Sequence, residues 1–246
     1  MIAFEWGPAG ARRLAPGAAC LVVVDVLSFT TSVSVAADAG MRVFPYRWRD
    51  GSARAYATSV DAVLAVGRRE ASESSPWSLS PAALRRAPFT PRLVLPSPNG
   101  STIAAEAGAA TVVAASLRNA DAVAQWLAAE DYGTAARPLA VIASGERWPD
   151  GSLRPALEDQ LGAGAVISAL RALGRFELTP EAAVTAAAWE STADPAAAVR
   201  ACFSGRELIE GDLAGFAEDV RIACEISVST AVPVLMDGAF AAQPAG

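Results

Sequence analysis

Acidic residues follow apolar runs at several points along the chain, and their carboxylates offer most of the chemistry in this sequence. Asp25 is the sharpest case, because it interrupts the apolar run CLVVVDV over 20–26. A carboxylate inside a buried run must be paired, metal-bound or catalytic, because burying it alone costs too much free energy. The plainer alternative is that Asp25 caps a helix starting near Ser28 to Thr31. Asp25 is therefore a candidate catalytic or metal-binding acid.

Three further acids have a similar setting. Glu146 lies in Gly145-Glu146-Arg147 after the apolar run 139–143, and Glu158 and Asp159 open a helical pattern over 157–173. Together with Asp25 they could hold Mg²⁺, which takes oxygen ligands and keeps several waters. Adjacent acids on a helix are usually a solvated face, and their side chains point about 100° apart, so one of the pair could be structural. The catalytic candidates are Asp25, Glu146 and Arg147, and the metal candidates are Asp25, Glu158 and Asp159.

Groups suited to binding an anion stand at the ends of the same runs. The segment Asn99-Gly100-Ser101-Thr102 offers hydroxyls and backbone donors to an oxyanion, although a plain Asn-Gly turn with a serine cap has the same letters. Arg118 followed by Asn119 could present a guanidinium to phosphate or sulfonate. More often, such a pair is an exposed arginine followed by an asparagine that caps a helix. The substrate-binding candidates are Thr30, Thr31, Asn99, Gly100, Ser101, Thr102, Arg118, Asn119 and Gly145.

Missing residue types exclude several mechanisms. The chain has no histidine, and all 20 of its basic residues are arginine. Ser-His-Asp hydrolysis, histidine-ligated zinc, lysine Schiff bases and Walker A loops each need an imidazole or an ε-amine. A thiol phosphatase needs Arg six residues after Cys, where this chain has Val26, Leu208 and Thr230. Carboxylate, hydroxyl, amide and guanidinium chemistry remain.

Charge and cysteine usage bound the partners. The net charge of −6 disfavours nucleic acid, since a phosphate backbone needs a positive field. No apolar stretch reaches the roughly 18 residues that span a bilayer, and residues 1–8 lack the features of a signal peptide. The three cysteines form no CxxC pair and suit a reducing compartment as free thiols. We expect a cytoplasmic protein that binds neither nucleic acid nor membrane.

Dense apolar runs alternate with helical patterns, and this alternation builds a sheet covered on both faces. We predict an α/β protein, a three-layer α/β/α sandwich around a largely parallel or mixed sheet, as one domain over 1–246. Glycines 162 and 164 should let the helix 157–173 lie close to the sheet, and 72–91 reads as a loop. The expected strands are 20–26, 42–46, 92–95, 111–115, 139–143 and 232–235. The expected helices are 29–39, 59–71, 119–130, 157–173, 180–190 and 195–202.

Four of the expected strands run straight into small polar and charged residues: VVVDVLSFTT, VLPSPNGST, VVAASLRNA and AVIASGERWPDG. Ligands of open α/β sheets bind outside the carboxyl ends of strands, where loops and helix amino termini converge. The four segments therefore predict one shared pocket.

Five blocks together resemble the 2-phosphosulfolactate phosphatase family, in order and spacing over most of the chain. The resemblance implies a three-layer α/β/α fold and a Mg²⁺-dependent acid phosphatase that releases phosphate from (2R)-2-phospho-3-sulfolactate, on the route to coenzyme M. The blocks are DVLSFTTSVSVAADAG (25–40), SPNGST (97–102), SLRNADAVA (116–124), SGERWPDGSLRPALEDQLGAGAVI (144–167) and SGRELIEGDLAGFAEDVRIACEI (204–226).

The candidate residues above, apart from Thr102 and Arg147, match the motifs of this family. Arg206 and Asp219 match its last block, with no role assigned to either. The chain departs from the family pattern at one position that concerns specificity. The resemblance implies an arginine three residues after the first aspartate, and this chain has Ser28 there. Losing a guanidinium at the mouth of a pocket could change which anionic substrate is preferred.

Several alternatives stay open from the sequence. The nucleophile is either a metal-bound water or Asp25 itself, through an aspartyl-phosphate. The substrate is a small anionic phosphorylated molecule, either 2-phosphosulfolactate or another phosphorylated hydroxy acid. A rival is a non-catalytic protein that binds a phosphorylated metabolite. A homo-oligomer is expected only because small metabolic enzymes commonly form one.

Overall fold

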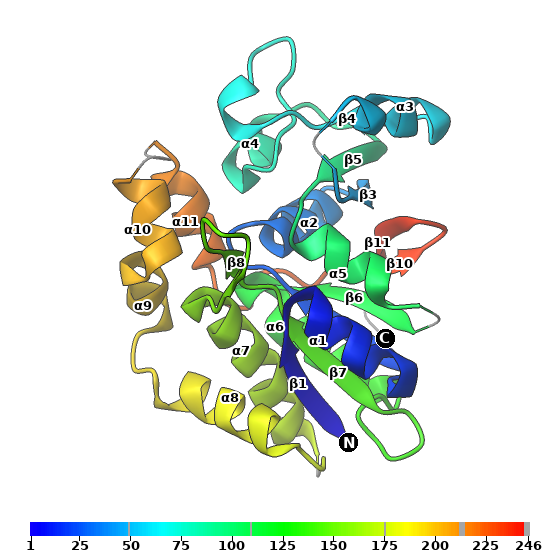
Figure 1. Ribbon diagram of the computed structural model, residues 1–246, viewed down its shortest axis with the longest axis vertical. Coiled ribbons are helices and arrows are strands. Elements are labelled where there is room, and N and C mark those ends of the chain that lie inside the picture. Colours follow the sequence, from blue (N-terminus) through cyan, green and yellow to red (C-terminus); the bar gives the residue numbers. More distant parts are fainter. Residues whose placement is uncertain (49, 109, 175, 212–214, 244–246) are drawn as a thin grey trace.

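The computed structural model describes residues 1–48, 50–108, 110–174, 176–211 and 215–243 (Figure 1). In these ranges nine strands form one sheet, in the order β1-β7-β2-β6-β10-β11-β3-β5-β4, and helices cover both of its faces. The predicted three-layer α/β architecture is confirmed. The strands of this sheet are β1 Ile2–Trp6, β2 Cys20–Val24, β3 Arg42–Tyr46, β4 Val63–Leu64, β5 Arg92–Pro96, β6 Thr111–Ala115, β7 Leu139–Ala143, β10 Val232–Met236 and β11 Ala239–Gln243.

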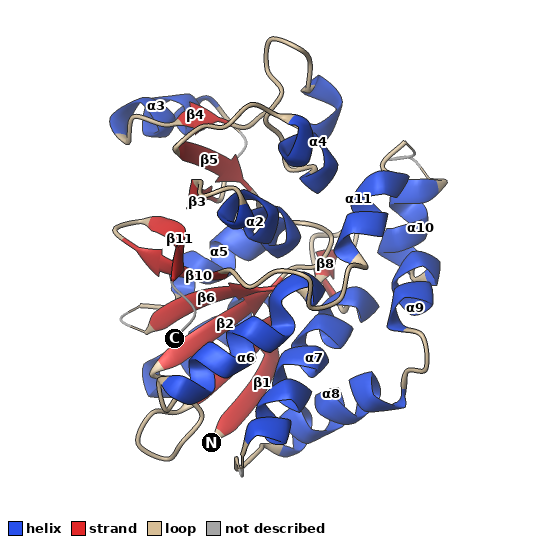
Figure 2. Cartoon of the chain, turned by 180° about the vertical axis from the view of Figure 1, so that it is seen from behind, coloured by secondary structure: helices blue, strands red, loops and turns tan. Residues whose placement is uncertain are grey.

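The helices fall on the two faces and at the upper end of the molecule, as the coloured cartoon shows (Figure 2). A separate two-stranded hairpin consists of β8 Glu146–Arg147 and β9 Leu153–Arg154. The α-helices are α1 Gly7–Leu14, α2 Phe29–Asp38, α3 Gly51–Ser59, α4 Pro81–Arg86, α5 Gly100–Glu106, α6 Ala120–Ala129, α7 Leu157–Leu173, α8 Pro180–Ser191, α9 Pro195–Ala201, α10 Phe203–Ile209 and α11 Ala217–Ala223.

Strand β2 shows why the sheet is covered on both sides. Its five residues are all fully buried, and successive side chains of a strand point to opposite faces. Val22 and Val24 pack into the core formed with α6, α7 and α8, whereas Leu21 and Val23 pack into the core formed with α1, α2 and α5. A strand with apolar residues at every position can bury both faces only between two helical layers.

The sheet is mixed and consists of two parallel groups. Strands β1, β7, β2 and β6 run parallel to one another, and so do β3, β5 and β4. The hairpin β10–β11 joins the groups, because β10 pairs antiparallel with β6 and β11 pairs antiparallel with β3. The loops after β2 and β7 consequently leave the sheet side by side.

Helix α7 lies against β2 as the glycine pattern predicts. A Cβ atom added at Gly162 would lie 2.7 Å from Val26 Cγ2 and 2.8 Å from Val24 Cγ1, closer than side chains pack. Gly164 serves a different neighbour, because a Cβ there would lie 2.5 Å from the carbonyl oxygen of Thr185 in α8. The close approach of α7 to the sheet sets Glu158 and Asp159, in its first turn, beside the loop after β2.

The prediction of a helix over 59–71 is wrong. Helix α3 ends at Ser59, and the chain continues as the short strand β4 and the 3-10 helix η2, Arg68–Glu70. The helix begins earlier because Asp50 caps it, with Oδ1 accepting a hydrogen bond of 2.9 Å from Ser52 N–H. The segment 72–91, predicted as a loop, contains α4. Strands β1 and β11 were not predicted.

None of the helices in the described ranges combines the length and the apolar character needed to cross a membrane. The cysteines at 20, 202 and 224 are free, as expected. The segment from α3 to α4 lies at one end of the molecule, above α2, and α4 packs against both α2 and α11 (Figures 1 and 2). This placement brings η2 over the loop that carries Asp25.

Candidate active site

Asp25 is buried directly after β2, and backbone donors from two loops hold its carboxylate. Oδ1 accepts a hydrogen bond of 3.1 Å from Phe29 N–H, at the start of α2. Oδ2 accepts one of 3.0 Å from Gly100 N–H, at the start of α5. Asp25 thus caps α2, as the plainer interpretation of the sequence has it, and at the same time joins the loop after β2 to the loop after β5.

Asp159 makes the equivalent connection on the other side. Its Oδ1 accepts a hydrogen bond of 2.7 Å from Val26 N–H, and its Oδ2 accepts one of 2.8 Å from Gly145 N–H. One buried side chain of α7 therefore ties the loop after β2 to the loop after β7. With both oxygens held by backbone donors, Asp159 is placed to position the site.

Glu146 and Asn99 complete the group of hydrogen-bonded residues around Asp25 and Asp159. Asn99 Nδ2 donates a hydrogen bond of 3.0 Å to Glu146 Oε2, which links the loop after β5 to the hairpin β8–β9. The polar ends of β2, β5 and β7 thus meet through hydrogen bonds. Three of the four segments predicted to share a pocket are therefore joined to one another.

Glycine is required at two positions of this group. A Cβ added at Gly100 would lie 2.9 Å from Asp25 Oδ2 and would overlap the ring of Phe29. Gly145 has a positive φ of 65°, and a Cβ there would lie 2.9 Å from the carbonyl oxygen of Arg154. Both glycines let a backbone N–H approach a carboxylate closely.

Burial and mutual repulsion make the acids of this group weak. Burial raises the pKa of Glu146 to about 7, with the charges of Asp25 and Glu158 adding to the effect. Burial likewise raises the pKa of Asp159 well above its usual range. Burial also raises the pKa of Asp25, which the N–H groups of Phe29 and Gly100 and the charge of Arg68 oppose. A carboxyl with a pKa near neutrality is suited to proton transfer.

Glu158 is only 2% exposed, so the alternative of a solvated acidic face is wrong for it and for Asp159, which is 3% exposed. The thiol of Cys202 donates to Glu158 Oε2 over 3.1 Å. Burial raises the pKa of Cys202 to about 12, and the charge of Glu158 adds to this. The thiol is therefore a donor to the carboxylate rather than a nucleophile.

The chemistry of this donor set fits a hard divalent cation. Four carboxylates, those of Asp25, Glu146, Glu158 and Asp159, repel one another in a poorly hydrated region, and a cation would relieve that repulsion. Within the described ranges, no three His, Cys, Asp or Glu side chains are grouped closely enough to enclose an ion. An open site of one or two carboxylates, completed by water and substrate oxygens, is how proteins commonly hold Mg²⁺.

The sequence pattern that defines the 2-phosphosulpholactate phosphatase family matches residues 11–238. The chain belongs to this family. A probable 2-phosphosulfolactate phosphatase of Deinococcus radiodurans is 30% identical over 222 residues, which cover 88% of each of the two chains. As a member of the 2-phosphosulfolactate phosphatase family, the chain is a phosphoric monoester hydrolase. The resemblance inferred from the five sequence blocks is confirmed.

Two residues predicted to bind substrate, Arg118 and Asn119, make their hydrogen bonds with residues outside the acid group. Arg118, in the turn after β6, is buried and pairs with Asp38 over 2.8 Å and with Glu225. Asn119 caps the turn after β6, with Oδ1 accepting from Ser116 N–H over 2.8 Å. The fourth polar strand end therefore forms a partly buried ion-pair network, in which Arg118 is buried and its two acidic partners are partly exposed.

The hydroxyls of Thr30 and Thr31 hold the loop of Asp25 in place. Thr30 Oγ1 donates to the Asp25 carbonyl oxygen over 2.8 Å, and Thr31 Oγ1 donates to the Val26 carbonyl oxygen over 2.7 Å. Both threonines are fully buried, so we assign them to positioning. Ser101 Oγ is buried without a hydrogen-bond partner among the described residues.

The side chains of Thr102 and Arg147 donate their hydrogen bonds to loop carbonyl oxygens. Thr102 Oγ1 donates to the Pro98 carbonyl oxygen over 2.6 Å. Arg147 is exposed, and its Nη1 donates to the Gly151 carbonyl oxygen in the β8–β9 turn over 3.1 Å. The structure thus gives the catalytic role predicted for Arg147 no supporting contact.

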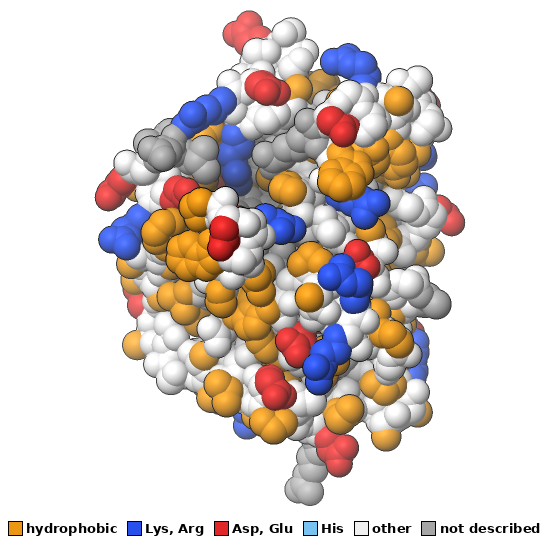
Figure 3. Space-filling view, in the orientation of Figure 1, with side chains coloured by type: hydrophobic (Ala, Val, Ile, Leu, Met, Phe, Trp, Pro, Cys, Tyr) orange, Lys and Arg blue, Asp and Glu red, His pale blue; other side chains and the backbone are white. Residues whose placement is uncertain are grey.

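Two other arginines, which the sequence did not single out as ligands, lie beside the acids. Arg154, in β9, lowers the pKa of Glu146 by its charge, against the larger effect of burial. Its guanidinium carbon lies 4.5 Å from the centre of the Phe203 ring and 5.7 Å from that of Trp148. Apolar side chains gather over α10 and this hairpin on the face drawn in Figure 3. The other arginine, Arg68, comes from η2.

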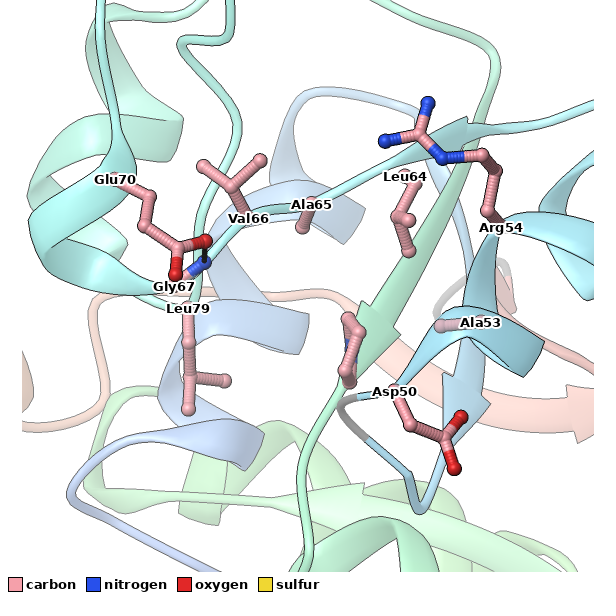
Figure 4. A pocket seen from close by; sticks show the side chains of 10 residues that line it. Asp50, Ala53, Arg54, Leu64, Ala65, Val66, Gly67, Glu70 and Leu79 are labelled. Atoms are coloured by element: carbon pink, nitrogen blue, oxygen red, sulfur yellow. Dashed lines mark hydrogen bonds between the residues drawn. The ribbon is translucent and has the colours of Figure 1, made fainter.

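A cavity of about 290 Å³ adjoins η2 (Figure 4). Its wall includes Leu64, Val66, Leu79 and Arg54, and the Gly67 N–H donates to Glu70 Oε2 over 3.2 Å at its edge. None of the four clustered carboxylates lines it. The acid cluster, and not this cavity, carries the chemistry expected of a phosphatase.

Proposed function

We propose that this protein is a Mg²⁺-dependent phosphatase that hydrolyses the phosphate monoester of (2R)-2-phospho-3-sulfolactate to 3-sulfolactate and phosphate. The observation that carries the proposal is the group of Asp25, Glu146 and Glu158, which backbone and side-chain donors from three loops hold together. Membership of the family gives the class of reaction.

In this proposal Asp25 and Glu158 hold Mg²⁺, and Asp159 orients the loops around them. Asp159 is given the orienting role because its hydrogen bonds join the loop after β2 to the loop after β7. When bound, Mg²⁺ supplies positive charge for the oxygens of the phosphoryl group. Phe29 and Gly100 fix Asp25 through their N–H groups, so its carboxylate needs no reorganisation during the reaction.

Glu146 acts as the general acid in this proposal. Burial raises the pKa of Glu146 to about 7 in the metal-free protein, so this side chain can carry a proton in mildly acidic solution and give it to the leaving alkoxide oxygen. Asn99 holds Oε2 of Glu146, which leaves Oε1 to face the substrate. Water is the nucleophile we favour over Asp25, because backbone donors engage both oxygens of Asp25.

The test is phosphate release from 2-phospho-3-sulfolactate, phospholactate, phosphoglycerates and p-nitrophenyl phosphate, with Mg²⁺ and again with EDTA. We expect Mg²⁺-dependent release that favours the sulfonate. Turnover of the other esters alone would move the function to another phosphorylated hydroxy acid. No release from any ester by folded protein with Mg²⁺ would favour a non-catalytic binding protein.

A further inference from the structure

Arg68 reaches the acid cluster from a different part of the molecule than the other site residues. It is the first residue of η2, in the segment that joins β4 to α4, and its side chain is 15% exposed. Its Nη2 donates to Ser28 Oγ over 2.5 Å, at the start of α2. Its charge also lowers the pKa of Asp25, against the larger effect of burial.

Asp219 of α11 orients the side chain of Arg68. The side chain of Asp219 is 1% exposed, and its Oδ2 accepts from Arg68 Nε over 3.3 Å. Its Oδ1 accepts from Ser80 Oγ over 2.5 Å and from Ala82 N–H over 3.1 Å, both at the start of α4. The acid is therefore anchored to α4 on one side and holds the arginine on the other.

The guanidinium is left with capacity for a ligand. Asp219 takes Nε and Ser28 takes Nη2, while Nη1 has no hydrogen-bond partner among the described residues. The ring of Phe216 lies 5.8 Å from the guanidinium carbon and covers part of it. A fixed, partly buried guanidinium with a vacant donor is suited to a carboxylate or a sulfonate.

The direction of approach separates Arg68 from the groups assigned to the phosphoryl end. Asn99 and Glu146 reach the cluster from the ends of β5 and β7, whereas Arg68 reaches it at Ser28, from η2. A phosphorylated sulfonated hydroxy acid carries further negative charge beyond its phosphate. That charge needs a cation to offset the four carboxylates nearby.

We propose that Arg68 binds the anionic group of the substrate that is not hydrolysed, its sulfonate or carboxylate, and that Asp219 positions Arg68 for this contact. The inference rests on the proposed function, because it names a specificity residue of that same site. Arg68 places its guanidinium at Ser28, the position where the family pattern implies an arginine and this chain has none.

The first test is steady-state kinetics of Arg68→Gln beside Arg69→Gln, since Arg69 is exposed on the same short helix. We expect Arg68→Gln to raise KM for 2-phospho-3-sulfolactate about 10- to 100-fold with little change in kcat, since a hydrogen bond to a charged group is lost. KM for p-nitrophenyl phosphate, which has neither anionic group, should stay the same. Arg69→Gln should match the wild type on both substrates.

Phospholactate identifies the anionic group. A rise in KM for 2-phospho-3-sulfolactate alone assigns Arg68 to the sulfonate, and an equal rise for phospholactate assigns it to the carboxylate. An equal loss on p-nitrophenyl phosphate would place Arg68 at the phosphoryl group and overturn the inference, as would no change on any substrate.

Asp219→Asn tests positioning. It should raise KM for 2-phospho-3-sulfolactate and spare p-nitrophenyl phosphate, whereas a purely structural role would affect both substrates alike and overturn the positioning claim. If Asp219→Asn does not fold, Arg68→Lys takes its place. Lysine keeps the charge but loses the fork that Asp219 and Ser28 hold, so the same split in KM is expected.

Calorimetric titration with 3-sulfolactate separates this inference from the proposed function. Wild-type protein should bind 3-sulfolactate, and Arg68→Gln should weaken binding at least tenfold. Arg68-dependent binding without hydrolysis would overturn the proposed function alone. Hydrolysis with unchanged binding in Arg68→Gln would overturn the inference alone, and wild-type protein that neither hydrolyses the ester nor binds 3-sulfolactate would overturn both.

Discussion

Asn99 donates a hydrogen bond of 3.0 Å to Glu146, and this contact joins the loop after β5 to the hairpin that follows β7. The two residues are 47 positions apart in the chain, and the contact lowers the pKa of Glu146 against the stronger effect of burial. Asn99 thus sets how much of Glu146 is protonated near neutral pH, and so bears directly on its role as an acid.

Removing this contact should move the pH dependence of the reaction. In Asn99→Ala the carboxylate of Glu146 loses a donor, so its pKa rises further and the alkaline fall in kcat shifts upward by roughly half to one pH unit. The pH profile of kcat with 2-phospho-3-sulfolactate measures the shift. An alkaline limb that stays in place would show that Glu146 is not the group that titrates there.

Metal-free protein should lose stability as pH rises. Glu146 has a raised pKa in the folded state, so the folded protein binds more protons than the unfolded chain between pH 4.5 and about 7, and the free energy of unfolding falls across that window. Asp25, Glu158 and Arg154 all face Glu146, and their charges add to or oppose the effect of burial. The half-buried side chain limits the loss to roughly 2 kcal/mol, or about 4–8 °C in Tm.

Thermal melting in EDTA from pH 5 to pH 8 measures this loss. Added Mg²⁺ should raise Tm more at pH 8 than at pH 5, because deprotonated carboxylates bind the cation. A Tm in EDTA that increases steadily over this range, with no greater effect of Mg²⁺ at the higher pH, would contradict the assignment of a metal to this cluster.

Much of the fold follows from local patterns, and the failures have local causes. Strands β3, β6 and β7 have the predicted bounds because each is a dense apolar run that ends at polar residues. The segment from 59 to 71 has a helical spacing of apolar residues, yet Val63 and Leu64 pair with β5, a tertiary contact that the spacing does not reveal.

A site residue could be predicted where its polarity differs from that of its neighbours in the sequence. It could not be predicted where the site depends on contacts between residues distant in the sequence. Asp25 stands out because a carboxylate interrupts an apolar run. Arg68 and Asp219 are 151 positions apart, and although Asp219 lies in a block that resembles the family, nothing in the sequence indicates its contact with Arg68. The ion pairs of Arg118 could not be predicted for the same reason, because its partners Asp38 and Glu225 come from distant elements.

Gly100→Ala should damage both stability and activity. The added methyl group would lie 2.9 Å from Asp25 Oδ2 and would press on the Phe29 ring, so the start of α5 must shift and the Gly100 N–H must leave Asp25. Overpacking of this kind costs about 1–3 kcal/mol. Chemical denaturation and kcat measure the two effects. Gly17→Ala is the matched control, because a Cβ there meets nothing within 4 Å; equal behaviour of the two variants would argue against the close approach at Gly100.

The most direct test of catalysis at this cluster is the rate of Glu146→Gln on two leaving groups. Glutamine keeps the shape of the side chain and its contact with Asn99 but cannot donate a catalytic proton. A sulfolactate alkoxide needs that proton, whereas p-nitrophenolate leaves readily without it. We expect kcat to fall about 10²- to 10⁴-fold on 2-phospho-3-sulfolactate and to change little on p-nitrophenyl phosphate, with the exposed Glu130→Gln as the control. An undiminished rate on 2-phospho-3-sulfolactate, or an equal loss on both esters, would contradict the account.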